Sequence, residues 1–134
     1  LPTYSNSTKE NTMAKFSDLL GKTLVMVHGG KGDEEIRFWT DAGEEYLMYH
    51  ERDCCESVYI EDIEGDLQSL TGNPILIAEE SNDRDMPPAD GADDSYTWTF
   101  YKIATIKGHV DIRWFGSSNG YYSESVDFEL IKPK

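Results

Sequence analysis

The sequence has few cysteines, no long apolar run and few basic side chains. Its two cysteines are the neighbours Cys54 and Cys55, so they cannot cross-link distant parts of the chain into a disulfide framework. No apolar stretch approaches the ~20 residues that a membrane-spanning helix needs. Residues 1–16 lack the basic and apolar regions of a signal peptide. We therefore expect no membrane association, and free thiols in a reducing cytoplasm.

Basic side chains are outnumbered by acidic ones: 12 Lys and Arg face 26 Asp and Glu, for a formal net charge of −14. The imbalance is concentrated in residues 33–94, which carry 20 acidic and 3 basic side chains. Such a field repels nucleic acids and anionic membranes and attracts basic surfaces. The composition therefore argues against direct binding of nucleic acid, and it favours a protein partner with a basic surface.

The chain length and the spacing of its apolar residues predict one β-rich domain. A chain of 134 residues is long enough to bury a core without metals or disulfides. Val110, Ile112 and Trp114 alternate with polar residues, as in a strand with one buried face. We expect segments 95–107, 109–115 and 121–131 to form an antiparallel meander. Earlier strands are expected at 22–28, 35–40, 44–50, 57–60 and 74–80, with a hairpin turn at 41–44 and a loop at 81–94.

Two short helices complete the expected fold. One lies within residues 13–23; in the other, Ile63, Leu67 and Leu70 recur at i, i+4 and i+7 and an acidic first turn begins at Glu61. The fold class is thus α+β: a single domain, mainly a twisted antiparallel β-sheet, with one or two short helices. A sheet rolled toward a barrel is an alternative. The domain spans residues 13–134 and follows a flexible extension, residues 1–12.

The acidic middle of the chain offers a candidate binding surface. Carboxylates of the second expected helix and of the next strand could form a row of charge, which resembles the phosphates of a nucleic acid. The alternative is an ordinary solvated face. The residues of this candidate protein-binding surface are Glu61, Asp62, Glu64, Asp66, Glu79 and Glu80.

A second candidate is a thiol or redox site made of His50, Cys54 and Cys55. Structural zinc takes four ligands, and adjacent cysteines on an extended chain point to opposite faces. Flanking carboxylates disfavour the reactive thiolate. A disulfide between neighbours would be strained, because their Cα atoms lie ~3.8 Å apart while disulfides prefer ~4.4–6.8 Å. We therefore expect no metal, no cofactor and no catalytic residues, and keep a metal- or thiol-dependent protein as the alternative.

Several long stretches resemble a family of small bacteriophage and prophage proteins of unknown function. The stretches are DLLGKTL, MYHERDCCESVYIEDIEGDL, GNPILIAEE and SYTWTFYKIATIKGHVDIRWFGSSNGYYSESVDF, and together they cover most of residues 17–128. The resemblance implies a phage origin and a setting in the host cytoplasm. It implies no catalytic residues.

These observations favour a small, acidic, non-enzymatic accessory protein of a phage. It would bind a host or phage protein with a basic surface, and it could inhibit a host nucleic-acid-binding or defence protein by charge mimicry. A minor structural component of the virion is a further alternative. The protein would be a monomer or a homodimer, since an open sheet edge can pair with a second copy.

Overall fold

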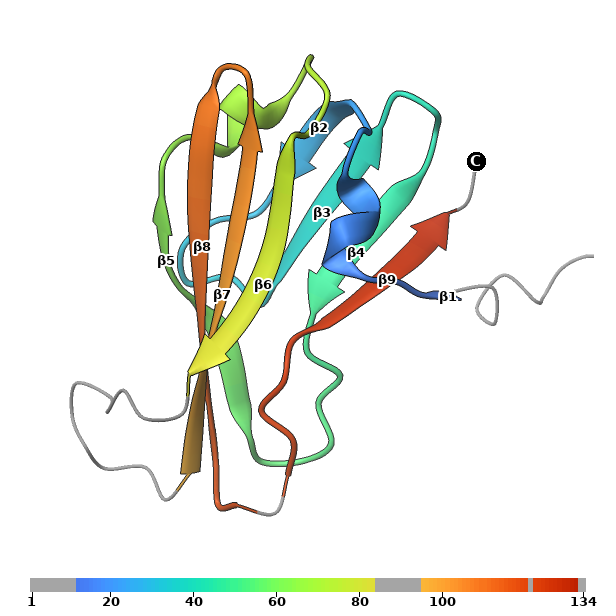
Figure 1. The fold of residues 1–134 in the computed structure, drawn as a ribbon. Coiled ribbons are helices and arrows are strands. Elements are labelled where there is room, and N and C mark those ends of the chain that lie inside the picture. Colours follow the sequence, from blue (N-terminus) through green and yellow to red (C-terminus); the bar gives the residue numbers. More distant parts are fainter. Residues whose placement is uncertain (1–11, 84–94, 121, 133–134) are drawn as a thin grey trace, which may run out of the picture.

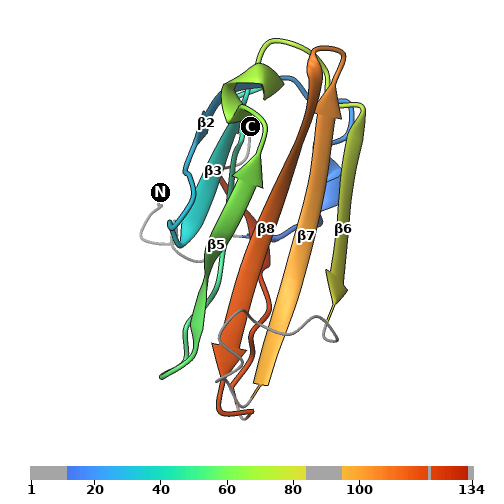
Figure 2. The ribbon, with the colours of Figure 1, turned by 90° about the vertical axis from the view of Figure 1, so that its left-hand side faces the viewer.

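The computed structural model describes residues 12–83, 95–120 and 122–132, and these form two antiparallel β-sheets that face each other (Figure 1). The five-stranded sheet has the order β1 (Thr12–Met13), β9 (Asp127–Lys132), β4 (Glu45–Tyr49), β3 (Glu35–Thr40) and β2 (Leu24–His28). The four-stranded sheet, seen face-on in Figure 2, has the order β5 (Ser57–Glu64), β8 (Gly108–Ser118), β7 (Ser95–Thr105) and β6 (Ile77–Asp83). Two short 3-10 helices, η2 (Phe16–Leu19) and η3 (Leu67–Leu70), complete the described elements.

This architecture confirms the antiparallel sheet and corrects the fold class. The described residues contain no α-helix, so the structure is mostly β rather than α+β. The strands also do not close into a barrel, because each sheet ends in two edge strands. The alternating apolar residues of the sequence fill the space between two separate sheets, as in a β-sandwich.

The core lies between the inner faces of the two sheets. Ile36 and Phe38 of β3 face it from one side, and Ile103 of β7 and Ile112 of β8 face it from the other, all essentially without exposure to water. The indole N–H of Trp114 donates a hydrogen bond to the sulfur atom of Met48 across the core, over 3.2 Å. Burial of such side chains contributes ~1.5–3 kcal/mol each.

The 3-10 helix η2 inserts an aromatic side chain at one side of the sandwich. Phe16 is buried, and its ring packs edge-on against Phe38, Tyr101 and Phe128, with ring centroids 4.8–6.4 Å apart. Phe38 and Phe128 belong to the five-stranded sheet, and Tyr101 belongs to the four-stranded sheet. The sequence therefore placed the first helical turn correctly, although it is one turn of 3-10 type.

The second expected helix is wrong, because residues Ser57–Glu64 form the strand β5. The spacing of Ile63, Leu67 and Leu70 arises from the end of this strand followed by the 3-10 helix η3. Gly65 joins the two with φ +106°, and a Cβ there would lie 2.9 Å from the carbonyl oxygen of His109 on β8. Since the backbone presses against β8 at Gly65, the chain continues as a sheet strand up to this point instead of coiling into a helix.

The expected meander is correct for β7 and β8 but wrong for the last strand. β9 does not pair with β8; it pairs with β4 and β1 in the opposite sheet. The connection to β9 lies close against β8 at Glu124, where a Cβ on Gly116 would meet the carbonyl oxygen of Glu124 at 2.6 Å. The glycine thus makes room for the chain to cross from one sheet to the other.

Two sequence expectations concern segments without a described structure. The extension of residues 1–12 lies outside the described residues except for Thr12, which begins β1. Of the loop expected at 81–94, residues 81–83 belong to β6, and the rest lies outside the described residues.

Candidate functional site

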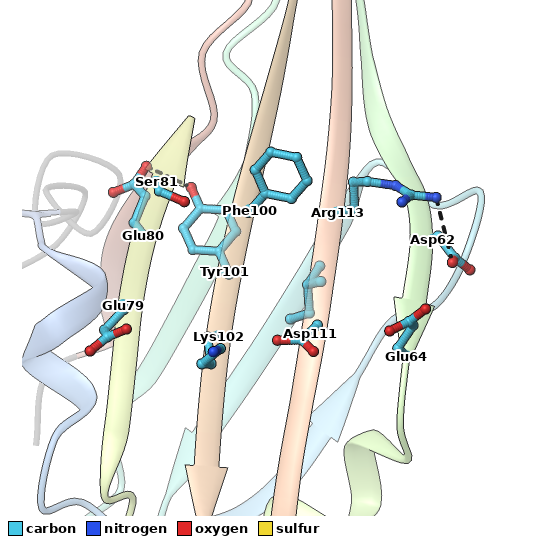
Figure 3. Close-up of a pocket in the computed structure, with 11 residues that line it drawn as sticks. Asp62, Glu64, Glu79, Glu80, Ser81, Phe100, Tyr101, Lys102, Asp111 and Arg113 are labelled. Atoms are coloured by element: carbon cyan, nitrogen blue, oxygen red, sulfur yellow. Dashed lines mark hydrogen bonds and ion pairs between the residues drawn. The ribbon is translucent and has the colours of Figure 1, made fainter. Parts of the chain in front are cut away.

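A groove of about 540 Å³ lies on the outer face of the four-stranded sheet (Figure 3). All four strands of that sheet contribute side chains to it. Its lining residues are Asp62, Glu64, Glu79, Glu80, Ser81, Phe100, Tyr101, Lys102, Asp111, Ile112 and Arg113. Five of these are carboxylates and two are cations, so the groove is acidic. We refer to it as the acidic groove.

One row of charged side chains crosses the acidic groove. The strand register places Glu64 of β5 opposite Asp111 of β8, Asp111 opposite Lys102 of β7, and Lys102 opposite Glu79 of β6. Cross-strand partners have Cβ atoms ~4.5–5.5 Å apart, and like charges placed directly opposite each other are destabilising. The row therefore holds three carboxylates around one ammonium group, with Glu64 and Asp111 as a like-charge pair.

The next row contains a fixed cation and an aromatic ring. It runs from Asp62 to Arg113 and on to Phe100, which is half-buried. The Nε atom of Arg113 donates to Glu61 over 2.7 Å, and its guanidinium lies 5.6 Å from the centre of the Trp98 ring. Arg113 is thus held by a partner carboxylate and an aromatic face. Arg113 forms no described ion pair with Glu64, Glu79 or Asp111. It therefore offsets the charge of these three carboxylates less than that of its ion-pair partners on β5.

A tyrosine fixes the carboxylate of Glu80, which shares the inner face of the sheet with Tyr101 beside the acidic groove. The hydroxyl of Tyr101 donates a hydrogen bond to Glu80 over 3.0 Å. Burial raises the pKa of Tyr101 strongly, and the neighbouring charge of Glu80 raises it further. Tyr101 therefore stays protonated and remains a donor, which holds the Glu80 side chain in place.

The structure brings together most of the predicted acidic surface, although not on a helix. Asp62 and Glu64 of β5 line the same groove as Glu79 and Glu80 of β6. Glu61 borders the groove and binds Arg113. Asp66 serves a different purpose: its carboxylate caps η3 by accepting a hydrogen bond from the backbone N–H of Gln68.

Sequence reasoning missed the contribution of β7 and β8 to this groove. Asp111 and Arg113 lie on the outer face because Val110, Ile112 and Trp114 point inward. That alternation was visible in the sequence. The pairing of β8 with both β5 and β7 was not, and only this pairing places Asp111 between Glu64 and Lys102.

Two of the predicted thiol or redox residues, His50 and Cys54, contact the buried carboxylate of Glu56. The two ring nitrogens of His50 lie 2.7 Å from the backbone oxygen of Ser125 and 2.7 Å from Oε2 of Glu56. A neutral imidazole carries one N–H, so both contacts are hydrogen bonds only when the ring is doubly protonated. His50 is therefore directed at these two oxygen acceptors and away from the role of a base for a thiol.

Glu56 organises the loop that carries the cysteines. Its carboxylate accepts hydrogen bonds from the backbone N–H groups of Asp53, over 2.8 Å, and of Cys54, over 3.0 Å. The bond from Asp53, followed by the contact with His50 and the bond from Cys54, lowers the pKa of Glu56 to about 2 although burial opposes the shift. The carboxylate thus stays ionised and fixes the turn of the backbone.

Cys54 and Cys55 are exposed and joined in a disulfide, where the sequence predicted free thiols. The expectation that neighbouring side chains point to opposite faces holds for an extended chain, but the backbone bends at these two residues. No group of three or more His, Cys, Asp or Glu side chains in the described parts of the chain is placed to hold a metal ion.

No helix within the described ranges is long and apolar enough to cross a membrane. The acidic groove also contains no histidine or cysteine among its described lining residues. Its side chains can hold charge and can donate or accept hydrogen bonds.

Comparisons with known proteins assign a family and no activity. Searches of curated proteins and of solved structures gave no significant match. Residues 17–128 match a family described as a domain of unknown function, DUF7448. Since this match covers most of the 134 residues, the chain belongs to the DUF7448 family.

Proposed function

We propose that this protein acts by binding a partner protein, and that a basic segment of the partner lies in the acidic groove. The observation that carries the proposal is the row of Glu64, Asp111, Lys102 and Glu79, in which three carboxylates surround one cation. Complementary charge steers association and fixes the register of a complex. A basic side chain entering this row would relieve the repulsion between Glu64 and Asp111.

The floor of the acidic groove supports a basic partner over a metal ion or a small anion. Phe100 is half-buried there and exposes an aromatic ring beside the charged row. Lysine and arginine carry an apolar stem below a charged head, so they can cover a ring while their charge reaches a carboxylate. Arg113 already lies against Trp98 in this way on the same face.

In its cellular setting, we propose a phage accessory protein that acts on a host or phage protein in the host cytoplasm. The resemblance of the sequence to phage and prophage proteins supports this setting. The net charge of −14 opposes direct binding to nucleic acid. A partner whose basic surface normally holds phosphates would instead meet the carboxylates of the groove, and its nucleic-acid-binding or defence activity would be inhibited.

A pull-down from host lysate with charge-matched variants tests this function. The groove variant Glu64→Gln/Glu79→Gln/Asp111→Asn removes three charges from the row. The control variant Asp33→Asn/Glu34→Gln/Asp41→Asn removes three exposed charges elsewhere, so both variants have the same net charge. We expect wild type and control to capture the same partner at ~0.1 M salt and to lose it at ~1 M, where the screening length falls from ~10 to ~3 Å.

The groove variant should capture much less of this partner at low salt. Equal capture by the groove variant and wild type would contradict the proposal, and so would capture that is insensitive to salt. Equal loss in both variants would show that net charge, rather than the groove, determines binding.

A further inference from the structure

A second, smaller pocket lies on the other face of β6 and β7. It has a volume of about 200 Å³, and it is lined by residues of these two strands, by Gly120 and by residues 122–126. The lining residues are Glu80, Asn82, Ser95, Thr97, Thr99, Gly120, Tyr122, Ser123, Glu124, Ser125 and Val126. Only Glu80 is shared with the acidic groove. The walls are rich in hydroxyl groups, and the volume far exceeds the ~30 Å³ of one water molecule.

A buried carboxylate that pairs with no described basic side chain defines the chemistry of this pocket. Glu124 is 8% exposed. One of its oxygens accepts a hydrogen bond from the hydroxyl of Thr97 over 2.8 Å, and the other accepts one from Ser118 over 2.6 Å. No basic side chain among the described residues pairs with it. A buried charge is costly unless a partner of opposite charge compensates it.

The position of this carboxylate is fixed by the backbone. The carbonyl of Glu124 packs so closely on Gly116 of β8 that a Cβ there would lie 2.6 Å away. The two hydroxyl donors come from β7 and from the end of β8. The pocket is therefore formed before any ligand enters, and a ligand would not have to order it.

We propose that this pocket binds a guanidinium group, as carried by an arginine side chain. An ionised carboxylate has about four acceptor positions, two on each oxygen. Thr97 and Ser118 each occupy one position, and the side-chain hydrogen bonds among the described residues leave one acceptor on each oxygen, as a bidentate guanidinium requires. The remaining guanidinium N–H groups meet hydroxyl and amide oxygens of the walls. An ammonium group is a point charge and cannot make this paired contact.

The inference does not depend on the acidic groove. Its test is an NMR titration of the ¹⁵N-labelled full chain with two blocked amino acids, N-acetyl-arginine amide and N-acetyl-citrulline amide. Citrulline has nearly the same shape and no charge. We expect saturable shifts at the amides of Thr97, Thr99 and Glu124 with the arginine probe, and binding of the citrulline probe at least about tenfold weaker.

Variants separate this pocket from the groove. Glu124→Gln should weaken binding of the arginine probe about tenfold or more, whereas Glu64→Gln/Glu79→Gln/Asp111→Asn should bind like wild type. Asn82→Phe keeps the carboxylate and fills the pocket, so it should also lose binding, which covers the case that Glu124→Gln does not fold. Free arginine as a third probe identifies the source: tighter binding than the blocked form indicates the free amino acid, and equal or weaker binding indicates a side chain of a protein.

Three results would overturn the inference. They are equal binding of the arginine and citrulline probes, shifts confined to the outer face of the four-stranded sheet, and the absence of any saturable shift. The groove variant is titrated in parallel, so the two proposals can fail separately. The pocket can fail to bind the arginine probe while the acidic groove still binds a partner, and the groove can fail to bind a partner while the pocket still binds the probe.

Discussion

Nε2 of His50 and Oε2 of Glu56 lie 2.7 Å apart, and both side chains are almost completely shielded from water. His50 follows β4 in the five-stranded sheet, and Glu56 precedes β5 in the other sheet. The second ring nitrogen of His50 contacts the backbone of Ser125, in the segment that leads to β9. One imidazole therefore ties together two connections between the sheets, and the cysteine-bearing loop is held in the same network.

Replacing Glu56 by Gln should destabilise the fold in a pH-dependent way. The pKa of Glu56 is lowered from 4.5 to about 2, so its contribution to stability is present above pH 4.5 and is lost as the pH falls toward 2. We expect Glu56→Gln to lower Tm by ~5–10 °C at pH 7, with the difference shrinking toward pH 2. Thermal unfolding followed by circular dichroism between pH 2 and 7 measures this. The exposed change Asp41→Asn is the control, and a difference that does not vary with pH would contradict the account.

Tyr101 should not ionise while the protein is folded. Burial raises its pKa above 10, so its contribution to stability is present below pH 10 and is lost as the pH rises beyond that value. Absorbance titration of the tyrosines should therefore give the same curve for wild type and Tyr101→Phe until alkaline unfolding begins. If the absorbance change near pH 10 is smaller in Tyr101→Phe by the amount of one tyrosine, the Tyr101 hydroxyl ionises in the folded wild type. That result would contradict the prediction.

Phe16→Ala should cost ~3–5 kcal/mol of unfolding free energy, because this ring packs against rings of both sheets and leaves a cavity when removed. Urea denaturation measures the loss. Met13→Ala is the matched control, since Met13 is exposed and its truncation should change stability by less than ~0.5 kcal/mol. Similar losses in the two variants would mean that η2 is not part of the core.

Gly116→Ala should destabilise the protein by ~1–3 kcal/mol through a steric clash, since the new Cβ would lie 2.6 Å from the carbonyl oxygen of Glu124. Gly30→Ala provides the comparison. The nearest atom to its Cβ would be 3.9 Å away, so its effect should be small. Chemical denaturation of both variants decides the matter: a stable Gly116→Ala protein would show that the backbone at Glu124 does not pack on β8.

The sequence predicted the strands well where one face is buried. Val110, Ile112 and Trp114 lie in the core as their alternation indicates, and the turn at Gly43, with φ +88°, separates β3 and β4 as expected. The pattern failed at Ile63, Leu67 and Leu70, because a strand end followed by a 3-10 turn can reproduce helical spacing over three residues. It also could not assign β9 to a sheet, since alternation gives the buried face of a strand but not its neighbours.

The candidate site was predicted in composition but not in geometry. Glu64 and Glu79 are 15 positions apart in the sequence, and the groove joins them through Asp111 and Lys102 of the two strands between them. Such long-range pairing leaves no local signal in a single sequence. The role of Glu56 was likewise hidden, because a carboxylate in an acidic stretch is normally solvated, and only the fold surrounds it with N–H donors.

Hydrogen exchange of the complex with the captured partner tests the acidic groove most directly. The account predicts slower exchange of amides in β5 and β8 around Glu64 and Asp111 when the partner is bound, and no such change in the variant that lacks the three groove charges. Protection confined to β2 and β3 of the five-stranded sheet, with β5 and β8 unchanged, would contradict it.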